Sequence, residues 1–332
     1  MNPSARPIIA VGDLVWDVLV KPDRLLLPGG DTTGRIALAP GGSAANVAVW
    51  IARAGMPAGF VGKVGADDFG NLVVADLERE GVAAHVSRTD AHDTGVILVL
   101  IDRAGQRSMV TNQGADFHLL PENLPEQVLR SCAHVHITAW SLFTDPPRRA
   151  AIRAAQIAKE AGATVSFDPA SYQMILEMGF DKFQRITADL PVDILFPNRD
   201  EGQALTGETD PHAIALELHQ RYAGAIIALK LDRDGCYVLA GDHAQHYPTG
   251  EGPVVDATGA GDAFDAAFLA SYLRDSGRTG EEPDASQANA GARLAAAAKL
   301  ANAIGSWVVA HYGARPPADA ELAAILRKAA DA

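Results

Sequence analysis

Residues 254–264 read Val254-Val255-Asp256-Ala257-Thr258-Gly259-Ala260-Gly261-Asp262-Ala263-Phe264, so two β-branched residues lead into a turn of small residues. An apolar pattern at helical spacing follows, through Phe268 and Tyr272. A Gly-Ala-Gly turn that opens a helix presents backbone N–H groups at the positive end of the helix dipole, which attracts phosphate. An aspartate there would repel phosphate, so Asp262 indicates a hydroxyl group that loses its proton beside a phosphoryl group. The stretch therefore predicts phosphoryl transfer to an alcohol.

Strand and helix patterns alternate along most of the chain. This alternation predicts a mostly parallel sheet with helices on both faces. Short strands near residues 14–40 and 94–112 interrupt it, and we expect them to form a separate small sheet. We expect strands of the main sheet at 7–12, 134–137, 164–167, 193–196 and 225–229, and helices at 44–55, 67–80, 147–161, 172–187, 199–206 and 290–303.

Composition excludes several classes of protein. A net charge of -13 argues against a nucleic-acid-binding surface. Two cysteines, Cys132 and Cys236, are too few for a disulfide framework. The N-terminal residues lack the apolar core of a signal peptide, and the longest apolar runs are strand-sized, so we expect no membrane partner and a cytoplasmic location. A length of 332 residues suits one large α/β domain with an attachment, or two domains.

A second glycine turn, Gly41-Gly42-Ser43, precedes a helical pattern that contains Asn46. Ser43 could simply cap that helix. Alternatively, the paired glycines let a ligand approach the backbone, and Asn46 offers a donor and an acceptor to a polyol. Asp13 and Asp17 follow the first strand, where acids contact ligands in open α/β sheets, although either could be a solvated loop residue.

Five further polar positions allow two interpretations each. Asn198 and Glu201 lie where a strand becomes a helix, and they either cap that helix or orient magnesium-bound water near nucleotide phosphates. Lys230 ends a strand and either reaches a phosphate or is an ordinary exposed lysine. His134 and His136 alternate on one strand; a core position is the commoner case for such histidines, and a metal site is the alternative.

Two common nucleotide-binding motifs are missing from the sequence. Gly62-Lys63 is followed by Val64 and lacks the distal glycine of a P-loop. No complete Gly-x-Gly-x-x-Gly follows the first strand, which disfavours a nicotinamide oxidoreductase. The sequence therefore favours phosphoryl transfer without a P-loop.

Three segments in this order resemble the ribokinase-like, or PfkB, family of sugar and nucleoside kinases. They are Gly41-Gly42-Ser43-Ala44-Ala45-Asn46-Val47-Ala48 with Gly62-Lys63-Val64-Gly65-Ala66-Asp67-Asp68-Phe69-Gly70 after it, Asn198-x-x-Glu201, and Asp256 to Phe264. The resemblance covers nearly the whole chain. It implies a single kinase domain over 1–332, with a three-layer α/β/α core and a small β-sheet lid inserted at about 14–40 and 94–112.

The resemblance also implies an activity and a set of site residues. Mg-ATP would donate its γ-phosphoryl group to the primary hydroxyl of a small sugar, in the manner of a ribokinase or fructokinase. A nucleoside or a 2-keto-3-deoxy sugar acid is the alternative acceptor, and a non-catalytic sugar- or nucleotide-sensing protein is the alternative class. A homodimer through the exposed lid edge is a reasonable expectation. The implied roles are Asp262 as base; Gly259, Ala260 and Gly261 as anion hole; Asn198, Glu201, Lys230, Asn302 and Gly313 for ATP and magnesium, with Mg²⁺ carried by ATP; Asp17, Gly41, Gly42, Ser43 and Asn46 for the sugar; and Asp256 and Thr258 for a monovalent cation such as K⁺.

Three departures from the family pattern stand out. Ala257 replaces a common threonine, which is a small change. Ser43 stands where ribokinases proper often carry lysine, so ribose itself is in doubt. Lys230-Leu231-Asp232 stands where Thr-Leu-Gly is frequent, and Asp232 would place a negative charge near the phosphates.

Overall fold

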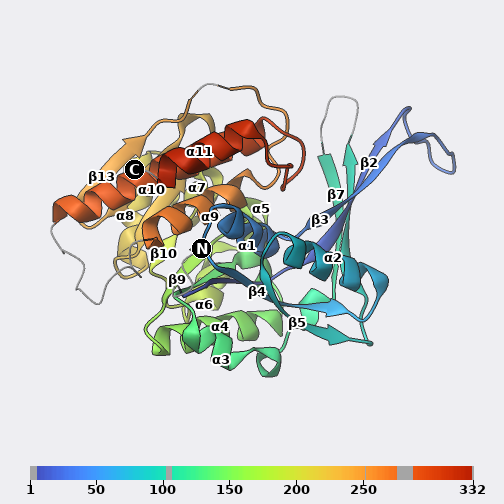
Figure 1. Cartoon of the computed structure of the whole chain (residues 1–332), viewed down its shortest axis with the longest axis horizontal. Coiled ribbons are helices and arrows are strands. Elements are labelled where there is room, and N and C mark those ends of the chain that lie inside the picture. The colour runs from blue at the N-terminus through green and yellow to red at the C-terminus, as the bar shows by residue number, and fades with distance from the viewer. Residues whose placement is uncertain (1–5, 102–106, 251, 275–286, 331–332) are drawn as a thin grey trace.

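The computed structural model describes residues 6–101, 107–250, 252–274 and 287–330, and it contains two sheets (Figure 1). The larger sheet has nine strands, of which all neighbours from β11 to β5 are parallel, while β12 and β13 form an antiparallel edge. This confirms the predicted mostly parallel sheet. Its strands, in spatial order, are β13 (His243–Tyr247), β12 (Cys236–Ala240), β11 (Ile226–Lys230), β10 (Ile194–Leu195), β9 (Thr164–Asp168), β8 (His134–Thr138), β1 (Ile8–Val11), β4 (Ala58–Gly65) and β5 (Ala83–Thr89).

The smaller sheet has four strands and projects from one side of the main body (Figure 1). Its strands come from the two regions that were expected to lie outside the main sheet. Part of the turn expected between its last two strands, at 102–106, lies outside the described residues. In spatial order the strands are β3 (Gly34–Gly41), β2 (Val15–Pro22), β6 (Thr94–Ile101) and β7 (Arg107–Gly114).

Helices cover both faces of the larger sheet and make two separate apolar cores. Strand β1 shows why, because Ile8 and Ala10 pack into one core while Ile9 and Val11 pack into the other. The first core contains α1 (Ser43–Arg53), α2 (Asp68–Arg79), α9 (Ala260–Leu273), α10 (Gln287–Val309) and α11 (Ala320–Ala330); the second contains α3 (Glu126–Ser131), α4 (Pro147–Glu160), α5 (Tyr172–Met178), α6 (Phe180–Thr187), α7 (Arg199–Thr206) and α8 (Pro211–Arg221).

One predicted helix is divided in two, and the helix predicted at 290–303 is longer, spanning Gln287–Val309. The pattern at 172–187 is two helices, α5 and α6, because Gly179 between them has φ 82°, which a right-handed helix cannot contain. Among the described helices, none has the length and apolar character that crossing a membrane requires.

Candidate active site

Helix α9 begins at the glycine turn and carries Asp262 in its first turn. Gly259 is the N-cap residue and has φ 72°, a left-handed conformation that glycine adopts without strain. The first N–H groups of a helix have no partner within it, and here the Ala260 N–H donates a 3.3 Å bond to the Ala257 carbonyl. The turn and the N-terminal end of the helix dipole therefore lie next to the Asp262 carboxylate, and an anion site there remains a prediction.

Asp262 is half-buried and is joined to the other glycine turn by one side chain. The Asn46 amide donates a 2.7 Å hydrogen bond from Nδ2 to Asp262 Oδ2. Burial raises the pKa of Asp262 to about 7, with further contributions from Asp168 and Asp13, while the Asn46 hydrogen bond and Lys230 act in the opposite direction. A carboxylate with this pKa suits a general base that works near neutral pH.

The second glycine turn lies at the start of α1. Gly42 is the N-cap residue with φ 99° and has no side chain that could cap the helix, so the expectation that Ser43 is the N-cap is wrong. The cap comes from the loop after β1, because the Asp13 carboxylate accepts hydrogen bonds from the Ser43 N–H (2.9 Å) and the Ala44 N–H (3.0 Å). Asp13 is thus committed to holding this turn in place.

Asp17 of β2 lies against the same turn. A β-carbon at Gly41 would be 2.6 Å from Asp17 Oδ1, so only glycine leaves room for that carboxylate. The turn is therefore bounded by Asp17 on the lid strand and by Asn46 on helix α1. Both offer hydrogen bonds of the kind that recognise sugar hydroxyls.

Lys230 lies beside the predicted anion site, in a buried charged cluster at the ends of β9 and β11. Its Nζ is 3.0 Å from Asp168 Oδ2 and 3.1 Å from Asp265 Oδ1. Burial works against a charged lysine, but Asp168 and Asp265 raise the pKa of Lys230, so it stays cationic. A β-carbon at Gly261 would be 3.5 Å from this Nζ. The ammonium group is therefore adjacent to the turn where it was expected to meet phosphate, and two carboxylates hold it there.

Asn198 and Glu201 form a capping box at the start of α7. The Asn198 side chain accepts from the Glu201 N–H, and the Glu201 carboxylate accepts from the Asn198 N–H, both at 2.8 Å. Glu201 is only 2% exposed. Burial raises its pKa to about 8, with Asp168 adding to the shift. The simple capping interpretation is thus correct, and the contact with magnesium-bound water remains a prediction.

The remaining predicted residues lie around the end of α10. Asn302 donates from Nδ2 to the Tyr247 carbonyl at 2.8 Å, so its amide holds strand β13. The Asp256 carboxylate accepts from the Thr258 N–H and from the Gly313 N–H, both at 2.9 Å. Asp256 therefore ties the turn before α9 to the segment after α10.

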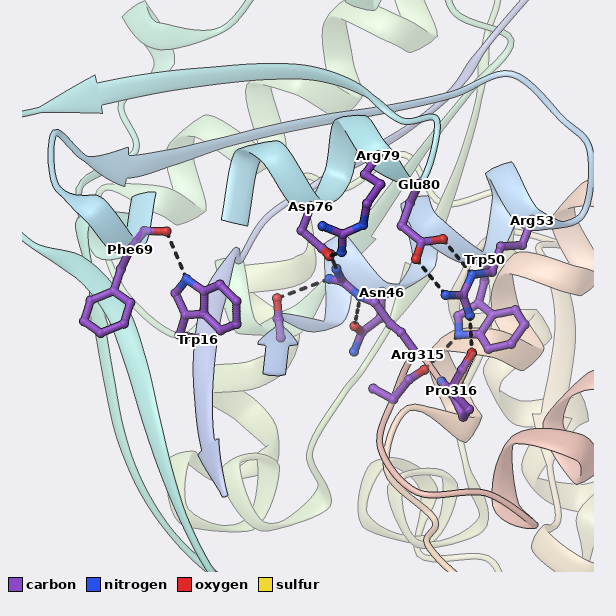
Figure 2. A network of polar contacts seen from close by, with 12 residues as sticks. Trp16, Asn46, Trp50, Arg53, Phe69, Asp76, Arg79, Glu80, Arg315 and Pro316 are labelled. Atoms are coloured by element: carbon purple, nitrogen blue, oxygen red, sulfur yellow. Dashed lines mark hydrogen bonds and ion pairs between the residues drawn. The ribbon is translucent and has the colours of Figure 1, made fainter. Parts of the chain in front are cut away.

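Sequence reasoning named Gly313 but missed the three residues that follow it; we call Gly313–Pro316 the anchoring segment. Trp50 Nε1 donates to the Ala314 carbonyl at 3.0 Å, and Arg53 Nη1 donates to the Pro316 carbonyl at 2.8 Å (Figure 2). Arg315 donates from Nε to Asn46 Oδ1 at 2.7 Å. The segment thus contacts both glycine turns. A lone arginine between small residues and prolines is its one sequence signal, and no spacing rule connects it to Asn46.

His134 and His136 belong to the core. His134 and His136 each place a ring nitrogen on the Ser166 hydroxyl, at 2.7 and 2.8 Å, and His134 also reaches Thr164 at 2.7 Å. Burial lowers the pKa of His136 to about 4. Within the described ranges no three His, Cys, Asp or Glu side chains are grouped as a metal site. The core interpretation of these histidines is therefore correct.

Known proteins of one family match nearly the whole chain. The profile of the pfkB family carbohydrate kinase matches residues 6–321. The ATP-dependent ribose-1-phosphate kinase of Halopiger xanaduensis is 34% identical over 322 residues, or 94% of this chain and 96% of that protein. The fructokinase of Klebsiella pneumoniae is 32% identical over 267 residues, or 79% of this chain and 83% of that protein.

Solved structures confirm the predicted ribokinase-like fold. The adenosine kinase from Sinorhizobium meliloti superposes with a TM-score of 0.81 at 26% identity, covering 98% of this chain and 99% of that one. The ribokinase from Thermotoga maritima superposes with a TM-score of 0.76 at 25% identity, covering 97% and 99%. The large parallel sheet and the small second sheet therefore belong to a known architecture.

Proposed function

Because the chain belongs to the pfkB family of carbohydrate kinases, and is therefore an ATP-dependent phosphotransferase acting on a sugar hydroxyl, we propose that Asp262 is its catalytic base. The observation that carries this is the 2.7 Å bond between Asn46 and Asp262, because it brings the two glycine turns to one point. A primary hydroxyl held from the Gly41–Gly42 side would lose its proton to Asp262 as it attacks. The N–H groups of Gly259 to Gly261 would stabilise the charge on the transferring phosphoryl group.

The proposed acceptor is a small neutral sugar, ribose or fructose in type. Asp17 and Asn46 supply hydrogen-bonding groups, and the carboxylates of Asp13, Asp17 and Asp262 would repel an acceptor that already carries a phosphate. The similarity to a ribose-1-phosphate kinase makes a sugar phosphate the main competing acceptor. The similarity to an adenosine kinase structure makes a nucleoside the next.

The nucleotide side of the site is proposed to lie along the Lys230 cluster. Glu201, Asp168 and Asp265 supply carboxylate oxygens there, the ligand type that magnesium and its bound water prefer. Asn198 and Glu201 would hold the water shell of Mg²⁺ that arrives with ATP, and Asn302 and Gly313 would border the adenine. When bound, Mg²⁺ neutralises phosphate charge. Lys230 would contribute a fixed positive charge next to the Gly261 turn.

An acceptor panel tests this proposal. Release of ADP is measured with ribose, fructose, ribose-1-phosphate, adenosine and 2-keto-3-deoxygluconate, each with and without K⁺. We expect the highest kcat/KM with a neutral sugar. Preference for ribose-1-phosphate would overturn the acceptor assignment. Absence of turnover on the whole panel would favour a sensing protein. A dependence on K⁺ that is lost in Asp256→Asn would support the cation site at Asp256 and Thr258.

We also propose a homodimer through the small sheet. Leu38, Val18, Leu98 and Val110 lie opposite one another across its four strands, on one face. Leu38 and Val110 are 55% and 64% exposed, and Ile36, two residues from Leu38, is 71% exposed. An apolar row this exposed is typical of a protein interface.

Sedimentation velocity tests the dimer. The wild type is expected to sediment as a dimer, and the double variant Ile36→Asp, Leu38→Asp as a monomer. Leu176 on α5 is 62% exposed and lies outside the small sheet, so Leu176→Asp is the matched control and should remain dimeric. A monomeric wild type at micromolar concentration would contradict the proposal.

A further inference from the structure

Arg315 makes three contacts that meet at the sugar side of the site (Figure 2). Its Nε donates to Asn46 Oδ1 at 2.7 Å, its Nη1 to Asp76 Oδ2 at 2.9 Å, and its Nη2 to the Gly41 carbonyl at 3.3 Å. The side chains of Arg315 and Asp76 are 4% and 6% exposed. The guanidinium is therefore held in one orientation by a buried ion pair, and it faces the second glycine turn.

The contact with Asn46 decides which end of that amide faces the base. An asparagine amide has an acceptor end and a donor end. A guanidinium can only donate, so Arg315 requires Oδ1, and Nδ2 is left pointing at Asp262 Oδ2, 2.7 Å away. With the amide turned the other way, Oδ1 would face the Asp262 carboxylate and repel it. One fixed arginine thus sets the donor that Asp262 meets.

We propose that Arg315 is a positioning residue for phosphoryl transfer: through Asn46 it presents a hydrogen-bond donor to Asp262 and keeps that carboxylate ready to accept a proton. This inference rests on the base role of Asp262 proposed above. Arg315 contacts Asn46 and Gly41 on the sugar side, and its proposed role needs no contact with the sugar or the phosphoryl group themselves. It acts through the chain Asp76–Arg315–Asn46–Asp262, which joins helix α2, the anchoring segment, helix α1 and helix α9.

The charges that face Asp262 fix the expected direction of the effect. Asp168 from the end of β9 and Asp13 from the loop after β1 raise its pKa, and Lys230 from β11 and the Asn46 hydrogen bond lower it. If Asn46 no longer donated to Asp262, Lys230 would be left to counteract the two carboxylates that raise the pKa of Asp262. A hydrogen bond to a charged group stabilises it by about 1.5 kcal/mol or more, so its loss raises the pKa of Asp262 by about one unit.

A simpler alternative is that Arg315 only holds the anchoring segment in place. Arg53 provides the matched control, because it also donates to that segment, at the Pro316 carbonyl, and is also held by an acid, through Glu80 at 2.8 Å. Arg53 does not contact Asn46 in the network of Figure 2. Arg315→Met and Arg53→Met therefore both weaken the same segment, but only the first frees the amide.

The experiment is a ¹³C NMR titration of the aspartate carboxyl groups in the sugar-free protein, with the Asp262 signal assigned by its loss in Asp262→Asn. Arg315→Met should move the Asp262 midpoint upward by about one pH unit, and Arg53→Met should leave it unchanged. Arg315→Lys keeps a cation but loses the planar fork, and should give a smaller upward shift. It serves as the second variant if Arg315→Met does not fold.

The pH profile of kcat/KM for the best acceptor supplies a second readout. In Arg315→Met the acid limb should move upward with the NMR midpoint, so that activity lost at neutral pH returns at alkaline pH. Equal midpoints in Arg315→Met, Arg53→Met and wild type would overturn the inference. The titration needs no turnover, so its outcome is separate from that of the acceptor panel. A silent panel with a shifted midpoint would count against the proposed acceptor and base role, and would still show that Arg315 controls the donor that faces Asp262.

Discussion

Gly259 at the start of α9 is packed directly against Ala314 of the anchoring segment. A β-carbon at Gly259 would lie 2.5 Å from Ala314 Cβ and 2.6 Å from its Cα. Gly259 also has φ 72°, which is unfavourable for any residue with a β-carbon. The turn proposed as the anion site and the anchoring segment are thus in contact through a residue that has to be glycine.

Gly259→Ala is therefore expected to destabilise the protein. The left-handed φ and the clash each oppose alanine, and together they should lower the free energy of unfolding by about 2 kcal/mol or more. Urea denaturation measures this as a lower midpoint. A midpoint equal to that of the wild type would show that the contact with Ala314 relaxes freely.

Gly261→Ala is expected to leave the protein stable but to lower its activity. Gly261 is a helical residue whose added β-carbon would meet only Lys230 Nζ, at 3.5 Å. Alanine is favoured over glycine in a helix by about 1 kcal/mol, so thermal stability should hold or rise. Turnover should fall, because the methyl group would occupy the space between Lys230 and the phosphoryl group. A kcat for Gly261→Ala equal to that of the wild type would show that this turn does not bind the phosphoryl group.

The pH dependence of activity should follow Asp262. Its pKa is raised to about 7, and a base must be ionised to accept a proton. We therefore expect kcat/KM to reach a plateau above pH 7 and to fall about tenfold per pH unit below it. A profile that stays flat down to pH 5 would contradict an ionised Asp262 with a raised pKa.

Asp232 should weaken nucleotide binding. Its φ is 53°, which explains why glycine is frequent at this position in the family and why an aspartate, which tolerates this conformation, is accepted. Asp232→Asn keeps the conformation and removes the charge. We expect the KM for ATP to fall about twofold to fivefold at low salt, with a smaller effect at high salt. An unchanged KM at low salt would place Asp232 away from the phosphates.

Local sequence signals predicted much of the fold. The strands of the parallel sheet carry β-branched and apolar runs, and α7 begins and ends at the residues its capping pattern indicates. Helix α8 was missed although Asp210 and Pro211 are good start signals, because its apolar spacing is weak. Strand β5 was missed because its residues, apart from Val86, are small or polar and it lies at the sheet edge.

Long-range contacts at the site could not be predicted in the same way. Asp262, the glycine turns and Asn198-x-x-Glu201 stand out because each is a local motif. Arg315 meets Asn46 across 269 residues and Asp76 across 239 residues, and no periodicity links such positions. Asp13 likewise caps a helix that begins 30 residues later. Only the folded chain shows that these residues serve one site.

The most direct test of the central claim is the turnover of Asp262→Asn with the best acceptor, measured together with its affinity for ATP. Asparagine keeps the shape of the side chain but does not act as a base. We expect kcat to fall by a factor of about 10²–10⁴, while the Kd for ATP stays close to that of the wild type. Near-normal turnover with normal ATP binding would show that Asp262 is not the base.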